Sequence, residues 1–184
     1  MTTKKIMGII ALVIVGGIGF LIFIIYATVK TKSTNLNKYE PFKEWIGQTV
    51  LLTRETVLFE EKLRSNENSQ YPYTLLDSLH PKWQYAQEQK NIGDIEEIVK
   101  FPACTTLKLE NAIQYTNGVS GSSYPTIFGT ITVNGNTYKT GYQWGTMDIG
   151  KSFDKIEKCW QFNQAPWQDV QDTTFYALPT ANFW

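Results

Sequence analysis

The chain has 184 residues, and its 17 basic and 17 acidic side chains give a formal net charge of zero. No Lys/Arg cluster marks a nucleic-acid-binding surface, and no acidic run marks a cation buffer, so neither class of partner is expected. Six Trp, ten Tyr and ten Phe favour β structure, because aromatic rings pack well on pleated sheets.

The first feature along the chain is a stretch of 24 residues without a charge, from Ile6 to Val29. As a helix it would extend about 36 Å, slightly more than the roughly 30 Å hydrocarbon core of a bilayer. The stretch exceeds the apolar core of a cleaved secretory signal, and Tyr26-Ala27-Thr28 is a poor cleavage site. We therefore predict an uncleaved signal-anchor that crosses the membrane once.

The flanking charges leave the orientation of this helix open, because two lysines lie on each side of it. The five-residue N-terminal tail also carries the α-amino charge and is easily retained in the cytoplasm. We expect a protein of the bacterial inner membrane whose C-terminal domain lies in the periplasm. Residues 1–30 then form the cytoplasmic tip and the anchor, residues 31–38 a polar linker, and residues 39–184 one exported β-rich domain.

The first half of that domain contains two extended segments. Residues 49–59 favour strand structure, either one strand or two with a kink at Arg54-Glu55. Pro72 restricts residues 71–78 to a sheet edge or an irregular segment, because proline cannot donate to a strand ladder.

The second half carries the clearest local signal. Asn134-Gly135 between two β-rich runs predicts a hairpin with a type I′ turn, joining strands at residues 125–133 and 137–144. Gly129, inside the first strand, predicts a bulge or a close approach of backbones.

The C-terminal part is less regular. Apolar residues at helix-like intervals predict a helix of about three turns over residues 151–162. Taken together, the elements predict a mainly β (α+β) chain: a single N-terminal transmembrane helix followed by a small antiparallel β-barrel-like domain with short helices.

Both cysteines, Cys104 and Cys159, follow the membrane segment. On an oxidising side of the membrane they would form a disulfide across a loop of about 55 residues, worth about 4 kcal/mol in the chain-entropy model. The alternative is two separate buried thiols. The predicted export favours the disulfide.

Two segments, Trp45–Phe59 and Phe128–Gly145, resemble strands of SH3-like small β-barrels. They are also similar to exported bacterial proteins in which such a domain follows a lipid or membrane anchor. The resemblance covers residues 42–146 and implies a binding or inhibitory domain in the bacterial envelope, without catalytic residues. In some of these proteins the domain protects the cell from a toxin delivered by a neighbour.

Candidate catalytic residues are few. His80 is the single histidine, and although Asp77 could orient it, no GxSxG context supplies a nucleophile. Next to Pro81, His80 is expected to be an exposed loop residue. Cys-x-x-Cys and His-Glu-x-x-His are absent, and neither Asp148 nor Asp154 belongs to an EF-hand pattern. We therefore expect no metal, no cofactor and no enzymatic activity.

A group of aromatic residues in and near the predicted hairpin is the best candidate for a partner-binding patch. Most of these rings should lie in the core, and those on the outward face could contact a protein or a glycan. The group consists of Tyr115, Tyr124, Tyr138, Tyr142 and Trp144.

These features favour a membrane-anchored envelope protein whose exported β-domain binds a protein partner, with toxin neutralisation of the immunity type as the specific case. The alternative is a structural or accessory subunit of a bacterial membrane complex. In that case Gly16, Gly17 and Gly19 would provide the helix-packing face, because small residues let helices approach closely.

Overall fold

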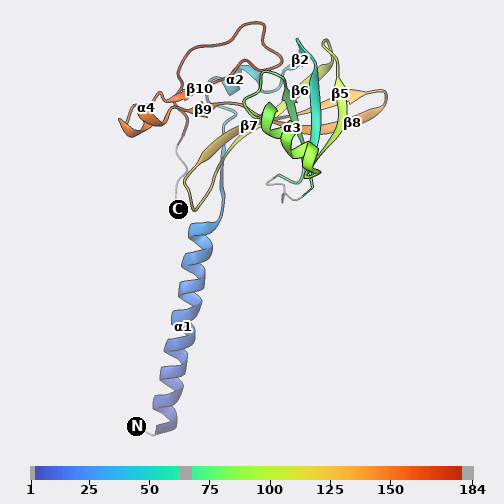
Figure 1. Ribbon diagram of the computed structural model, residues 1–184. Coiled ribbons are helices and arrows are strands. Elements are labelled where there is room, and N and C mark those ends of the chain that lie inside the picture. The colour runs from blue at the N-terminus through green and yellow to red at the C-terminus, as the bar shows by residue number, and fades with distance from the viewer. Residues whose placement is uncertain (1–2, 63–67, 180–184) are drawn as a thin grey trace. The chain divides into compact units, whose positions relative to one another are not determined.

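The structure is a computed structural model that describes residues 3–62 and 68–179 (Figure 1). Strands predominate, with four helices. In chain order the elements are α1 (Thr3–Val29), β1 (Lys32–Asn35), α2 (Phe42–Trp45), β2 (Thr49–Leu51), β3 (Thr56–Glu61), β4 (Tyr73–Asp77), α3 (Trp83–Ile92), β5 (Ile95–Phe101), β6 (Thr106–Thr116), β7 (Ser123–Val133), β8 (Asn136–Gln143), β9 (Thr146–Met147), α4 (Ile149–Phe153) and β10 (Trp160–Gln161).

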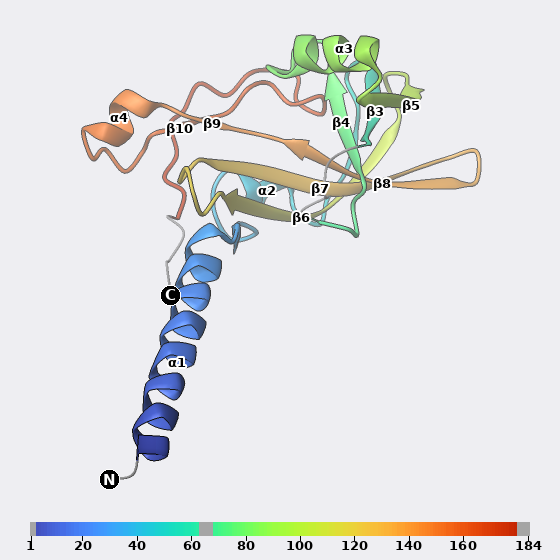
Figure 2. The same cartoon turned by 60° about the horizontal axis from the view of Figure 1, so that its bottom comes forward.

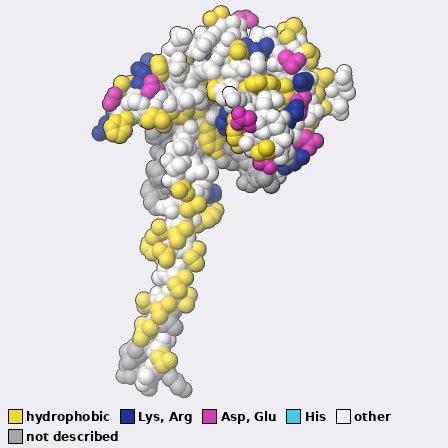
Figure 3. Space-filling view, viewed as in Figure 1, with side chains coloured by type: hydrophobic (Ala, Val, Ile, Leu, Met, Phe, Trp, Pro, Cys, Tyr) yellow, Lys and Arg dark blue, Asp and Glu magenta, His cyan; other side chains and the backbone are white. Residues whose placement is uncertain are grey.

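The chain divides into two compact units. The first contains residues 1–32 and 116–122, and the second contains residues 33–115 and 123–184. Within the first unit, α1 includes the segment Met7–Val29, which has a mean hydropathy of 3.0. The large apolar side chains that are described in it, from Met7 to Val29, are exposed (Figure 3). The chain therefore has one N-terminal helix that is long and apolar enough to span a membrane.

The second unit is built on a sheet of eight strands in the order β1-β6-β7-β8-β4-β3-β5, with β2 also paired to β6. Neighbouring strands are mainly antiparallel, but β4 and β8 run parallel. The strand order has two ends, β1 and β5, which are not paired with each other in the described residues. The sheet is therefore open, and the predicted barrel is not confirmed.

Several local predictions are confirmed. β7 and β8 form the predicted hairpin, in which Val133 pairs with Asn136 across a two-residue turn. Asn134 and Gly135 both have positive φ, at 52° and 80°, as a type I′ turn requires. The predicted kink at Arg54-Glu55 separates β2 from β3.

Two predictions about which segments join the sheet, and at which position, are wrong. Residues 32–35, expected in the polar linker, form edge strand β1, and the adjacent Leu36 is completely buried. β4 lies inside the sheet, between β8 and β3, rather than at an edge. Pro72 precedes the first residue of β4, Tyr73, so it removes no hydrogen bond from the ladder.

The predicted C-terminal helix is much shorter than expected. α4 ends at Phe153, and Lys155 adopts a left-handed φ of 59°, which stops the helix. The chain then returns as β10, which pairs with β9 through Trp160 and Met147. Core contacts of Cys159, Trp160 and Phe162 override the helical spacing, because these side chains enter the core from β10 and the residues that flank it.

The main core is a cluster of perpendicular aromatic rings. Phe42 from α2 contacts Trp144 and Phe162 at centroid separations of 5.5 and 5.4 Å. Trp144 in turn contacts Trp167 at 5.4 Å and donates its indole N–H to the Asn163 carbonyl at 2.7 Å. The aromatic content of the sequence is thus used to attach the C-terminal segment to the sheet.

The predicted disulfide is not formed. Cys104 and Cys159 are both free thiols; Cys104 is exposed, whereas Cys159 is buried. Cys104 lies in the connection between β5 and β6 with a φ of 67°. Cys159 is part of the main core beside β10. The two residues belong to separate local structures, so the disulfide expected from the predicted export does not join them.

Gly129 provides a test of how closely β6 and β7 approach. A Cβ atom at this position would lie less than 3.0 Å from the Lys108 carbonyl oxygen and the Leu107 side chain. Gly129→Ala should therefore lower the free energy of unfolding by about 1–3 kcal/mol, because the backbone must shift. Tryptophan fluorescence of the full chain during urea unfolding measures this loss. Gly150→Ala is the matched control, since a Cβ there meets only the Asp148 carboxylate at 3.3 Å; equal losses would contradict the prediction.

Candidate functional sites

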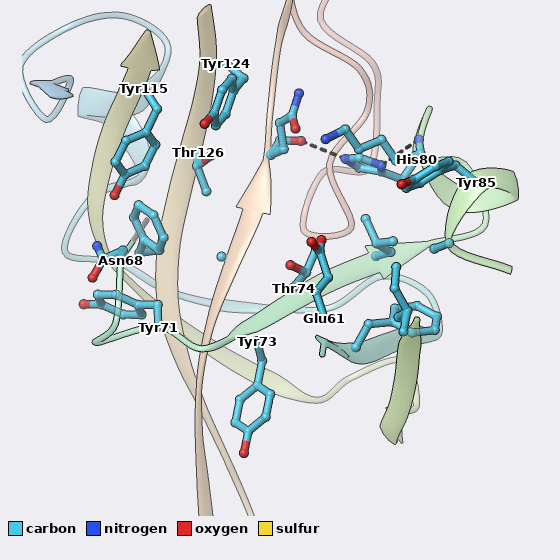
Figure 4. Close-up of a pocket in the computed structure, with 18 residues that line it drawn as sticks. Glu61, Asn68, Tyr71, Tyr73, Thr74, His80, Tyr85, Tyr115, Tyr124 and Thr126 are labelled. Carbon is cyan, nitrogen blue, oxygen red and sulfur yellow. Dashed lines mark hydrogen bonds between the residues drawn. The ribbon is translucent and has the colours of Figure 1, made fainter. Parts of the chain in front are cut away.

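In Figure 2, α3 lies above the strands β3 and β4. A groove of about 490 Å³ lies between α3 and the strands β6 and β7, and Figure 4 shows the side chains that line it. Its volume lies in the range of roughly 300–1,000 Å³ that is typical of small-ligand sites. Strands β4, β7 and β8 form the floor, so residues far apart in the sequence meet there. Apart from the walls described below, the lining includes Glu61, Asn68, Thr74, Thr126, Gly141 and Gln143.

Small side chains on the floor create the depth of the groove. Gly141 of β8 lies between Thr126 and Phe128 of β7, and a Cβ at position 141 would lie 2.9 Å from the Phe128 ring. The absence of a side chain there lets the Phe128 ring lie across β8. Thr74 on neighbouring β4 is also small. Small floor residues between bulky walls make this face concave.

The aromatic wall of the groove consists of Tyr71, Tyr115, Tyr124 and Phe128. Tyr115 and Tyr124 stack at a centroid separation of 5.9 Å with ring planes 30° apart. Tyr71 and Phe128 lie 4.7 Å apart at 39°. Tyr71 donates its hydroxyl to Glu110 at 3.0 Å; burial, reinforced by this carboxylate, raises the pKa of Tyr71 to about 12. Tyr71 is therefore a neutral donor at physiological pH.

The opposite wall is α3 and the turn that precedes it. His80 lies in this turn and is buried, in contrast to the exposed position predicted for it. Its Nδ1 accepts a hydrogen bond from the Lys82 amide at 3.0 Å, so Nε2 carries the proton and donates to the Gln143 carbonyl at 2.8 Å. The ring also packs edge-on against Tyr142 at 4.8 Å. Through these contacts His80 holds the wall in place.

A buried carboxylate, Asp77, connects this turn to the main core. Its Oδ1 accepts the Leu79 amide at 2.8 Å and pairs with Arg54 Nε at 3.2 Å. Its Oδ2 accepts the Tyr142 hydroxyl at 3.1 Å, and burial raises the pKa of Tyr142. Asn163 in turn donates to the Tyr142 oxygen at 2.9 Å. These bonds compensate the cost of burying the Asp77 charge.

The aromatic patch predicted from the sequence is divided between two environments. Tyr142 and Trp144 are 2% and 0% exposed in the main core, so they are inaccessible to a partner. Tyr138, on the same face of β8, is half-buried against Tyr73 and Phe101. Tyr115 and Tyr124 lie together in the aromatic wall of the groove. Tyr138 and Tyr142 share one face of β8, and that face is directed toward the core.

A second surface is the apolar projection, which comprises residues 148–159 and contains α4 (Figure 1). Ile149, Phe153 and Ile156 are 76%, 87% and 45% exposed there. Lysine and acidic side chains surround these apolar side chains in the space-filling view (Figure 3). The charged neighbours, in sequence order, are Asp148, Lys151, Asp154, Lys155, Glu157 and Lys158.

The base of the apolar projection is firmly held. The Asp148 amide donates to the Cys159 carbonyl at 2.8 Å, which closes the segment at its two ends. The Asp148 side chain accepts the Lys151 amide at 3.0 Å and so caps α4. The exposed apolar side chains are therefore presented by an ordered structure on the edge of the core.

The chain matches no protein-family model, no curated protein and no solved structure. Sequence reasoning missed both the groove and the apolar projection. Alternation along β7 and β8 could have indicated the groove floor, because Thr126 and Phe128 share a face with Gly141 and Gln143 of the hairpin. The sequence gives no such signal for the apolar projection. The helical spacing over residues 151–162 groups Phe153 and Ile156 with residues that lie in the core.

The buried His80 predicts a specific pH dependence of stability. Burial lowers the pKa of His80 below its usual 6.5, so the unfolded chain takes up the proton more readily than the folded chain. The free energy of unfolding should fall as the pH drops below about 6.5. Urea unfolding of the full chain at pH 7.5 and 5.5 measures this change.

The variant His80→Gln keeps a donor near Nε2 but cannot titrate, so its stability should change less between the two pH values. His80 is the sole histidine, and no other imidazole contributes in this range. The same pH dependence in wild type and variant would show that His80 is not responsible.

Proposed function

We propose that this chain is a membrane-anchored binding protein whose folded domain docks a protein partner through the apolar projection. The observation that supports this proposal is the exposure of Ile149, Phe153 and Ile156 on an ordered segment surrounded by charges. An apolar centre with a polar rim is the usual anatomy of a protein–protein interface. Large aromatic side chains such as Phe153, exposed at 87%, act as anchors when a partner covers them.

Neutralisation of a toxin is the specific case that we propose, with the domain on the periplasmic side of a bacterial inner membrane. A helix long and apolar enough to span a membrane supports the anchoring. The short, positively charged N-terminal tail supports an inside N-terminus. With both cysteines free, no disulfide adds support for export.

The hydrogen bonds of His80 and the burial of Asp77, both in the turn beside the groove, also favour a binding role over catalysis. His80 is neutral, and both of its ring nitrogens are used in hydrogen bonds to the backbone. Asp77 is completely buried beneath the turn. A general base must reach the proton that it abstracts, and neither side chain is placed to do so.

Photocrosslinking tests the partner. The full chain with p-benzoylphenylalanine at position 149 should form a covalent adduct with the partner in the cells that express it. Phe153→Asp in the same chain should reduce the adduct at least fivefold, because a charge in the centre of an apolar contact is costly to bury. Immunoblotting measures the adduct, and mass spectrometry identifies the partner.

The matched control places the photoreactive residue at position 92. Ile92 is 68% exposed at the end of α3, away from the apolar projection. Position 92 should give no adduct. Equal capture from both positions, or capture unaffected by Phe153→Asp, would contradict the proposed surface.

The exposed Cys104 tests the orientation of the domain. A membrane-impermeant maleimide added to cells with a permeabilised outer membrane should label the wild-type chain, because Cys104 is exposed and would face the periplasm. Cys104→Ser should abolish labelling, whereas Cys159→Ser should not, since Cys159 is buried. Labelling that requires disruption of the inner membrane would place the domain in the cytoplasm.

A further inference from the structure

We infer that the groove between α3 and the aromatic wall binds a neutral oligosaccharide. This site is separate from the apolar projection and goes beyond the proposed protein docking. The groove offers about 490 Å³, which suits a ligand of about two sugar rings with further rings extending outward.

The charges around the groove are balanced. Its lining contains one acidic residue, Glu61, and one basic residue, Lys82, while His80 is neutral. Behind the aromatic wall, Glu110 accepts the Tyr71 hydroxyl and lies 3.9 Å from Lys108 Nζ. Lys139 Nζ also lies 5.9 Å from the centroid of the Tyr71 ring. Among the described residues around the groove, cations and carboxylates are therefore mixed, and neither sign forms a cluster that would suit a phosphate or a polycation. The electrostatics therefore favour a ligand without net charge.

The aromatic wall provides flat surfaces rather than slots. Tyr115 with Tyr124, and Tyr71 with Phe128, form two pairs whose ring planes differ by only 30° and 39°. The main core, in contrast, is dominated by perpendicular pairs such as Trp144 with Phe162 at 67°. Tyr115 and Phe128 are 7% and 4% exposed and meet each other edge-on at 89°. Tyr71 and Tyr124 are only partly buried, so they provide the accessible aromatic faces of the wall. The C–H face of a pyranose ring is flat, apolar and of similar size. Burying that face against tyrosine rings is favourable.

Hydrogen-bonding side chains, most of them neutral, lie beside these rings and in the centre of the groove. Figure 4 shows Thr74 and Glu61 in the centre, with Tyr115 and Tyr124 at one end and His80 and Tyr85 at the other. Asn68, Thr126 and Gln143 add amide and hydroxyl groups to the lining. Hydroxyl and amide groups can both donate and accept. Sugar hydroxyls have the same dual character, so the two sets are complementary.

The position of the groove in the sheet argues against an extended peptide. The floor strands β7, β8 and β4 are internal, each paired on both sides. Both edges of each floor strand therefore already have a neighbouring strand, and no further strand can be added there. A peptide crossing this face would leave most of its own backbone groups without main-chain partners.

Binding of neutral hexasaccharides tests the inference. The probes are chitohexaose, cellohexaose and maltohexaose, added to the full chain in lipid nanodiscs, because glycoside detergents would compete for the site. Saturation-transfer NMR and calorimetry should detect at least one of them at millimolar concentration or below. Tyr124→Ala should weaken that binding about five- to tenfold, through loss of one stacking surface.

Tyr39→Ala is the matched control, because Tyr39 is 41% exposed and is not part of the groove lining. It should leave the affinity unchanged, and so should Phe153→Asp, which disables only the proposed protein contact. Absence of binding for all three sugars would overturn the inference, as would equal losses in the Tyr124 and Tyr39 variants. Displacement of a bound hexasaccharide by a neutral Gly-Ser-Pro peptide would assign the groove to peptides instead. None of these results would affect the crosslinking from position 149.

Discussion

The interaction on which the folded domain depends is the burial of the Asp77 carboxylate at the end of β4. Asp77 is completely buried, and Arg54, the Leu79 amide and the Tyr142 hydroxyl together satisfy its two oxygens. Removing one partner from such a buried ionic group typically costs about 3–5 kcal/mol, because the remaining charge is left uncompensated. The ion pair of Asp77 with Arg54 therefore constrains the geometry of this region more than it adds net stability. The ion pair fixes the position at which the chain leaves the sheet at the end of β4.

That constraint extends to both candidate sites. On one side, the turn after Asp77 contains His80, whose ring forms hydrogen bonds with the Gln143 carbonyl and the Lys82 amide. These bonds fix the position of the wall formed by α3. On the other side, Arg54 donates to the Gln164 carbonyl at 2.7 Å, and Tyr142 accepts from Asn163. These bonds hold the C-terminal segment on the core. Since β10 belongs to the same segment, the base of the apolar projection is positioned by the same network.

The two units meet different physical requirements. The folded domain buries its apolar residues in an aromatic core, whereas α1 exposes large apolar side chains along its whole length. A helix that is apolar all round is stable in lipid, where its backbone hydrogen bonds are satisfied internally. A single apolar N-terminal helix of this kind is consistent with membrane association.

The sequence by itself determined the elements whose cause is local. The length and apolar composition of Ile6–Val29, the positive φ of Asn134-Gly135 and the alternation of the hairpin strands needed no distant partner. Tertiary structure decided everything that depends on contacts between distant segments: the edge strand β1, the short α4, the burial of His80 and the separation of the two cysteines. The predicted aromatic patch was divided for the same reason. Alternation shows which residues share a face, but only packing decides whether that face becomes the core or the wall of a groove.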